Sequence, residues 1–275
     1  MRAATETKNN NMQNYCKTIG AMAAASALVA GNALAGTPVT TSVAPSQPAS
    51  AIEYDLHVGY SSMYLFRGRD LGDDLIEAGV NVKGNWNNFG LSAGAWYGSF
   101  DGPTGFSSPV GNANADELDL YTEASYDLGF LTAAVGYIYY YYPQGEANKL
   151  LINADNSQEV YFSLAKDFGC FKSSLTYFWD VSGADNDGYS ELALSRSFEL
   201  NSCLALALST NVGYLVEQGQ ATAWTTKLAL DWNFVGSAKL SPFTACSVAL
   251  SDDVDTLYNG SDNEWVGGAM LSVGF

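Results

Sequence analysis

The chain has 275 residues, with 12 lysines and arginines against 29 aspartates and glutamates, and a formal net charge of −17. Because binding to a phosphate backbone requires a basic surface, this charge argues against nucleic-acid binding. Hydrophobic residues make up 47% of the chain and charged residues only 15%. That balance excludes a disordered acidic protein and is unusual for a soluble domain of this length.

Residues 1–35 have the organisation of a secretory signal peptide. A polar start is followed by Lys17, by a run of small apolar residues over 18–31, and by Ala33-Leu34-Ala35 ahead of Gly36. This order of charge, apolar run and small-residue cleavage pattern predicts export. The alternative is an N-terminal helix of a cytosolic protein. Residues 36–51, which are rich in Pro, Ser, Thr and Ala, predict a flexible periplasmic leader.

From residue 52 onward, apolar and polar residues alternate. Leu118, Leu120 and Ala124 share one face of their segment, and Asp119 and Glu123 share the other. A period of two predicts β-strands. Twelve strands are expected, at residues 52–66, 75–85, 89–100, 117–127, 130–142, 158–167, 170–181, 189–199, 203–216, 222–234, 239–250 and 264–275.

The connections between these segments alternate between short and long. The short ones fall at 84–88, 127–129, 167–169, 200–202 and 235–238, and the long ones at 68–74, 101–116, 143–157, 182–188, 217–221 and 251–263. Short periplasmic turns opposite longer extracellular loops are typical of outer-membrane barrels. We therefore expect residues 52–275 to form an all-β, antiparallel transmembrane β-barrel of about 12 strands in the outer membrane of a Gram-negative bacterium. The alternative is a secreted β-sandwich.

Two short elements resemble a known family. Residues 59–68 end in Tyr64-Leu65-Phe66-Arg67-Gly68, and residues 136–143 read Gly-Tyr-Ile-Tyr-Tyr-Tyr-Tyr-Pro. Both are similar to strand elements of the TorF family of bacterial porins. The resemblance implies an outer-membrane barrel that acts as a porin, and it supplies no catalytic residues. This chain departs from the pattern in a longer acidic second loop and in three cysteines after residue 35.

If the apolar face meets lipid, alternation places the other face in the lumen. The expected pore-lining residues are ten acids and four bases, so rings of acidic side chains are expected to favour cations. The acids are Glu53, Asp55, Glu77, Asp119, Glu123, Glu159, Asp180, Glu191, Asp231 and Glu264, and the bases are Arg67, Lys83, Lys172 and Lys227. Since four bases cannot neutralise ten acids, we expect a hydrated lumen. The alternative is a filled interior in which acids and bases form a network.

Arg67 has two possible roles at the upper end of the first strand. It could line a constriction or bind an anionic solute. Alternatively, it pairs with an acid such as Glu77 on the next strand and fixes the register of the first hairpin.

Nothing in the sequence indicates catalysis or a cofactor. His57 is the only histidine, and its neighbours on the same face are Asp55 and Gly59. A single histidine excludes an all-imidazole metal site. The acidic stretches 185–188 and 251–255 lack the spacing of a calcium loop and are expected to be solvated. A disulfide between Cys170 and Cys203 is left open, because two-strand spacing exceeds the usual reach of the bond.

The function expected from these features is a porin-like channel for passive diffusion of small hydrophilic solutes, with a mild cation preference. The alternative is a non-conducting structural or adhesive barrel. The expected partners are outer-membrane lipid and lipopolysaccharide, small solutes or ions, and the barrel-assembly machinery, which would recognise Phe275. Whether loop 101–116 constricts the lumen is not decided by periodicity.

Overall fold

The computed structural model describes residues 52–101, 114–142, 156–182, 188–251 and 263–275. The expected signal peptide and leader, and most of the long loops including 102–113, lie outside these residues. Within the part of the chain that is described, no helix has the length and apolar character of a membrane span.

Twelve antiparallel strands form one closed barrel in which each strand pairs with its neighbours in sequence, as predicted. The strands are β1 (Ile52–Phe66), β2 (Arg69–Trp86), β3 (Phe89–Asp101), β4 (Asn114–Asp127), β5 (Thr132–Tyr141), β6 (Ser157–Asp167), β7 (Lys172–Asp180), β8 (Tyr189–Glu199), β9 (Leu204–Leu215), β10 (Gln220–Val235), β11 (Ala238–Ala249) and β12 (Glu264–Gly274).

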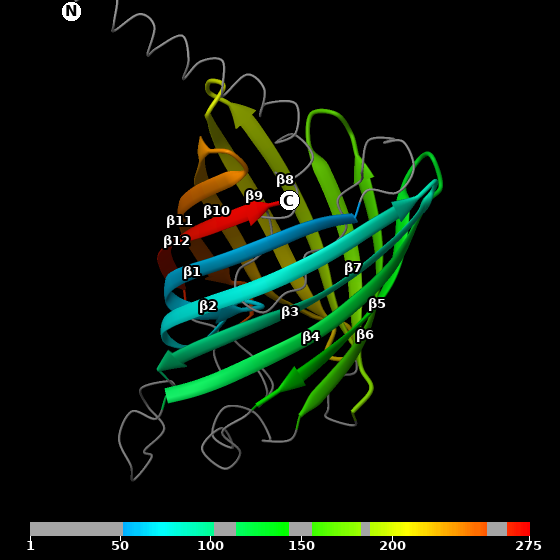
Figure 1. Ribbon diagram of the computed structural model, residues 1–275. Helices are drawn as coiled ribbons and strands as arrows, with labels where there is room; N and C mark the ends of the chain where they lie inside the picture. The colour runs from blue at the N-terminus through cyan, green and yellow to red at the C-terminus, as the bar shows by residue number, and fades with distance from the viewer. Residues whose placement is uncertain (1–51, 102–113, 143–155, 183–187, 252–262) are drawn as a thin grey trace, which may run out of the picture.

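The chain travels once around the barrel, and β12 returns to lie beside β1 (Figure 1). This seam runs from Asp55 opposite Gly274 to Ser61 opposite Gly268. The backbone of Phe275 extends it by exchanging two hydrogen bonds with Tyr54, at 2.9 and 3.2 Å. Closure leaves no strand edge among the described residues, which is the condition for a sheet to lie in hydrocarbon.

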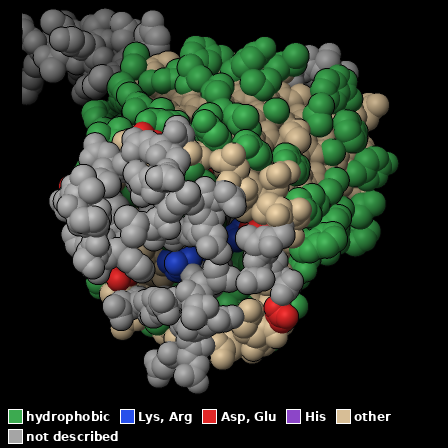
Figure 2. Space-filling view, turned by 90° about the horizontal axis from the view of Figure 1, so that it is seen from below, with side chains coloured by type: hydrophobic (Ala, Val, Ile, Leu, Met, Phe, Trp, Pro, Cys, Tyr) green, Lys and Arg blue, Asp and Glu red, His purple; other side chains and the backbone are tan. Residues whose placement is uncertain are grey.

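Alternate residues of each strand point outward and are apolar. In β1 the exposed set is Ile52, Tyr54, Leu56, Val58 and Tyr60, whereas the residues between them are mostly less exposed. Hydrophobic side chains surround the molecule when it is viewed toward the end with the long connections (Figure 2). An apolar outer wall of this kind suits a lipid environment and would be costly in water.

The two ends of the barrel differ, and we name them by their connections. The turn end carries the short connections at residues 87–88, 128–131, 168–171, 200–203 and 236–237, and the loop end carries the others. Two of the short turns repeat one device. Asp127 and Asp167 each accept a hydrogen bond from the backbone N–H of a glycine two residues later, Gly129 at 2.7 Å and Gly169 at 2.6 Å. Both glycines have a positive φ, which L side chains rarely adopt.

The largest difference from the expected strands lies at the first hairpin. Residues 69–74, expected in a loop, extend β2, so that only Arg67 and Gly68 connect it to β1. Both turn residues have positive φ, 52° and 84°, as a tight two-residue hairpin turn requires. The pairing shifts register between Met63 and Leu65. Such a bulge bends the strand and increases its local twist.

The cysteine question has a direct answer. Cys170 is a free, exposed thiol at a short turn, so the bridge to Cys203 is not formed. Cys246 is also free and lies on the outward face of β11.

The orientation of β1 can be tested with two adjacent substitutions. Val58→Arg should lower the free energy of unfolding by about 2–4 kcal/mol if Val58 lies near the bilayer midplane, because it places a guanidinium in lipid. His57→Arg should cost much less, since His57 faces the lumen 3.7 Å from the Asp55 carboxylate. Urea unfolding in phospholipid vesicles measures both. Equal costs would contradict the assigned faces.

Candidate functional site

The inner face of the barrel holds the fourteen charged residues expected there, with unequal exposure. Seven are buried, namely Arg67, Glu77, Asp119, Glu123, Glu159, Lys227 and Asp231. Six are partly exposed, namely Asp55, Lys83, Lys172, Asp180, Glu191 and Glu264. Glu53 differs from the rest, because it is exposed at the first turn of β1 at the turn end.

Arg67 reaches across the lumen. Its two terminal nitrogens donate to the two carboxylate oxygens of Glu159 on β6, at 2.8 and 2.6 Å. The guanidinium carbon also lies 4.5 Å from the ring centres of Phe178 and Tyr189, on β7 and β8, and 4.8 Å from that of Phe66. A bidentate ion pair enclosed by aromatic rings is a strong arrangement for a buried arginine.

This partner differs from the one expected. Glu77, on the strand next to Arg67 in sequence, accepts a hydrogen bond from Trp96 Nε1 at 2.6 Å instead. The reason is the tight turn, in which Arg67 adopts a left-handed conformation and its side chain points into the lumen rather than along β2. That conformation costs a non-glycine residue about 1–2 kcal/mol, which the ion pair and ring contacts offset.

The tip of the first hairpin therefore occupies the lumen at the loop end. Gly68 lies so close to β10 that an added Cβ would fall 2.2 Å from Cβ of Ala223. Leu65 packs in a cluster with Ala245 and Val266 of β11 and β12. Phe66 meets Tyr140 of β5, with ring centres 6.4 Å apart. The tip thus contacts strands around most of the barrel.

Tyrosine and tryptophan side chains hold most of the buried carboxylates. Four pairs share this arrangement, with a ring hydroxyl or indole N–H donating to an inward acid: Trp96 to Glu77 at 2.6 Å, Tyr64 to Glu117 at 2.8 Å, Tyr161 to Glu123 at 2.9 Å and Tyr140 to Glu159 at 2.9 Å. The sequence argument considered only bases as partners for the acids. Aromatic donors were missed, and they allow acids to be buried without an equal number of bases.

Two apolar clusters line the lumen beside these pairs. One joins Tyr64, Leu71, Leu75, Trp96 and Phe100 of β1–β3. The other joins Ile138, Tyr140, Tyr161, Phe178, Tyr189 and Leu215 of β5–β9. The loop-end half of the interior is therefore packed with side chains, in contrast to the hydrated lumen that the excess of acids predicted.

Tyr142 lies just beyond β5, next to the second cluster. Burial raises its pKa well above the usual value, and the negative charge of Glu117 acts in the same direction. Its hydroxyl consequently stays protonated and can donate a hydrogen bond at neutral pH.

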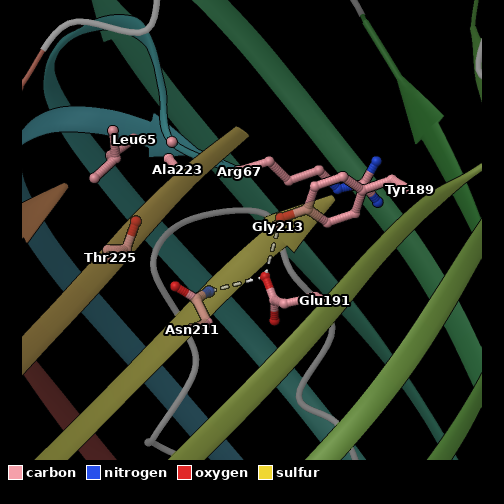
Figure 3. Close-up of a pocket in the computed structure, with 9 residues that line it drawn as sticks. Leu65, Arg67, Tyr189, Glu191, Asn211, Gly213, Ala223 and Thr225 are labelled. Atoms are coloured by element: carbon pink, nitrogen blue, oxygen red, sulfur yellow. Dashed lines mark hydrogen bonds between the residues drawn. The ribbon is translucent and has the colours of Figure 1, made fainter. Parts of the chain in front are cut away.

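A pocket lies beside Arg67, between the hairpin tip and β8–β10 (Figure 3). Its polar centre is Glu191, whose Oε2 accepts hydrogen bonds from Asn211 at 2.8 Å and from Tyr189 at 3.3 Å. Leu65, Gly68, Gly213, Ala223 and Thr225 complete the lining. The pocket combines a carboxylate, an amide and a guanidinium, which can hydrogen-bond a small polar solute.

Two inward charges were missed in the sequence, although parity could have located them. Glu117 precedes Asp119 by two residues on the same face and is 3% exposed. Lys239 lies on the inward face of β11, and its Nζ is 3.5 Å from Asp231 Oδ2. With these two residues included, the inner face carries eleven acids and five bases among the described residues.

The remaining sites considered in the sequence contribute little. His57 Nδ1 lies 3.7 Å from Asp55, and its ring covers Gly79, where an added Cβ would fall 2.3 Å from it. The acidic stretches 185–187 and 252–255 lie outside the described residues.

A closed antiparallel barrel with an apolar outer wall and a charged inner face defines an outer-membrane β-barrel protein. The family model described as "Bacterial protein of unknown function (Gcw_chp)" matches residues 45–265. The chain belongs to this family. The match agrees with the bacterial barrel that the sequence predicted and does not address the narrower resemblance to TorF porins. No curated protein matches the chain in sequence.

Solved structures share the architecture. An outer membrane channel from Pseudomonas putida F1 superposes with a TM-score of 0.53 at 14% identity, covering 85% of this chain and 100% of that one. The NanC porin gives 0.45 at 15% identity, covering 81% and 98%. Outer membrane phospholipase A from Escherichia coli gives 0.44 at 13% identity, covering 82% and 93%. Only the first exceeds 0.5, and at its identity it shows a common fold alone.

The Arg67–Glu159 pair predicts a large loss of stability when one partner is neutralised. Glu159→Gln should lower the free energy of unfolding by about 3–5 kcal/mol, because it leaves a buried guanidinium without its counter-charge. The matched control is Asp167→Asn, which removes the acid of an exposed pair with Lys172 at the turn end. That change should cost at most about 1 kcal/mol. Urea unfolding in vesicles compares them, and similar costs would show that the buried pair does not stabilise the fold.

Proposed function

We propose that the protein is a porin-like channel through which small hydrophilic solutes diffuse passively across the outer membrane. The observation that carries the proposal is the contrast between the two faces of one closed barrel. The outer wall is apolar, whereas the inner face carries charged side chains on nearly every strand. A charged interior that served only as a core would be costly to bury, so its presence favours a polar route.

A mild cation preference follows from the charges on the inner face. Eleven acids oppose five bases there among the described residues, and Arg67 and Glu159 neutralise each other. The partly exposed acids Asp55 and Asp180 add negative potential where water can enter. Fixed carboxylates concentrate cations and repel anions within about 8 Å at physiological salt.

The packed loop end limits what can pass. The hairpin tip and the two aromatic clusters fill much of the lumen there, so the proposed solutes are small ions and small polar molecules rather than oligomers. Twelve strands lie between the small barrels that side chains fill and the wide porins with open water channels.

The same packing favours one alternative, a non-conducting structural or adhesive barrel. The bidentate Arg67–Glu159 pair and its three aromatic contacts would then act as a permanent plug. Conductance separates the two functions.

We propose the surroundings that this function implies. The apolar wall would contact outer-membrane lipid, and the loop end would face lipopolysaccharide. Phe275, which is 71% exposed, would present its ring to the barrel-assembly machinery. We propose no enzymatic role, because His57 has only Asp55 as an acidic partner among the described residues and no nucleophile is placed against it.

The cation preference can be measured as a reversal potential. In a potassium chloride gradient across a planar bilayer, the refolded protein should prefer potassium, and the preference should fall between 0.1 M and 1 M salt as the Debye length shortens from about 10 to 3 Å. Neutralising Glu77, Asp119 and Glu123 together should reduce the preference further. The control neutralises Asp127, Asp167 and Glu199, which lie at the turn end. An anion-selective pore would contradict the proposed preference.

The role of the hairpin tip can be tested with Arg67→Ala. Removing the guanidinium frees Glu159 and opens space beside the pocket, so conductance should rise severalfold and potassium preference should increase. A wild type and a variant that both conduct no current would favour the structural barrel. A variant that conducts as the wild type does would show that Arg67 does not limit passage.

A further inference from the structure

One buried carboxylate on the inner face differs from its neighbours. Asp119 on β4 is 2% exposed, and neither of its oxygens has a hydrogen-bond donor among the described residues. The other buried acids of this half of the barrel accept bonds from Trp96, Tyr64, Tyr161 or Tyr140. A buried carboxylate that lacks donors is expensive, so its retention points to a group that is absent here.

The side chains beside Asp119 cannot supply that group, since their donors are directed elsewhere. In the register of the sheet, Asp119 lies directly between Trp96 of β3 and Tyr140 of β5. Trp96 donates to Glu77 and Tyr140 to Glu159. Along β4 itself, Tyr121 donates to Asn81 on β2.

The surroundings have the chemistry of a site for an ammonium group. Trp96 and Tyr140 flank Asp119 as directly opposed cross-strand neighbours, whose Cβ atoms lie about 4.5–5.5 Å away in such pairs. Glu117 is the next inward residue on β4 and adds a second negative charge. Carboxylates flanked by aromatic rings attract a cation through ion pairing, hydrogen bonds and cation–π contacts.

The donor count favours an organic ammonium over a metal ion. A primary ammonium carries three N–H donors and can satisfy both oxygens of one carboxylate and one oxygen of another. A metal ion needs several oxygen ligands at once. No group of three or more acidic, histidine or cysteine side chains suited to a metal ion occurs within the described ranges.

We infer that Asp119 anchors a binding site in the lumen for solutes that carry a primary ammonium group. Asp119 accepts the N–H bonds, Glu117 adds charge, and Trp96 and Tyr140 form the walls. This inference rests on the proposed channel function, because the ligand enters through the lumen. It narrows the cation preference to a class of organic solute.

Equilibrium binding tests the inference without requiring conductance. The probe is propylamine hydrochloride at pH 7, titrated onto refolded full-length protein in detergent micelles and followed by saturation-transfer NMR of the ligand. The wild type should bind it saturably, and 1-propanol, which has the same length and no charge, should not bind. Asp119→Asn should weaken binding at least about tenfold, the effect of losing one charge-assisted hydrogen bond. Asp127→Asn, the same charge change on the same strand at the turn end, should bind as the wild type does.

Each other outcome overturns the inference. Competition by potassium chloride at equal concentrations would identify a general cation site. Absence of saturable binding to the wild type would mean that Asp119 is held as a neutral acid. If Asp119→Asn fails to fold, as judged by heat-modifiable gel mobility, the wild-type comparison of propylamine, propanol and potassium still decides. A barrel that conducts but does not bind propylamine refutes the site alone, whereas one that binds propylamine without conducting refutes the channel.

Discussion

The structure depends on one constraint, that every backbone N–H and C=O within the hydrocarbon must find a partner in the protein. The seam between β1 and β12 meets it by joining the first strand to the last. Closure fixes which face of each strand meets lipid, and therefore every second residue must enter the lumen. With twelve strands that inner row encloses more space than small side chains fill, so the chain must either hydrate the interior or occupy it.

This protein occupies the loop-end half of its interior by a particular use of aromatic residues. Of the four tyrosines at 139–142, Tyr141 lies on the exposed face and Tyr140 on the buried one. The inward rings fill volume and at the same time donate hydrogen bonds to acids, as Tyr140 does to Glu159. Because these donors are neutral, the interior keeps its excess negative charge after the acids are satisfied. The buried acids thus combine structural order with an electrostatic field.

Local periodicity was sufficient to predict the strands. The segment 189–199 was expected from alternation and is β8 in the structure, and 52–66 is β1. The start of β2 was wrong, because Gly72 and Asp74 suggest a loop while long-range contacts of the hairpin tip hold the strand together. Parity also located the inward charges, including Glu117 when applied fully. The partner of Arg67 could not be predicted, since Glu159 lies five strands away and their proximity depends on the curvature of the closed wall.

The inward hairpin tip has a consequence for how the barrel forms. Arg67 and Glu159 are 92 residues apart, and the surfaces that receive the tip belong to strands from β5 to β12. None of these contacts can exist before most of the wall has assembled, because closing so long a loop is entropically unfavourable until neighbouring strands are paired. The lumen must therefore remain wider during assembly than afterward. Interactions of the tip belong to the last step of folding and govern how slowly the finished barrel opens rather than how quickly it forms.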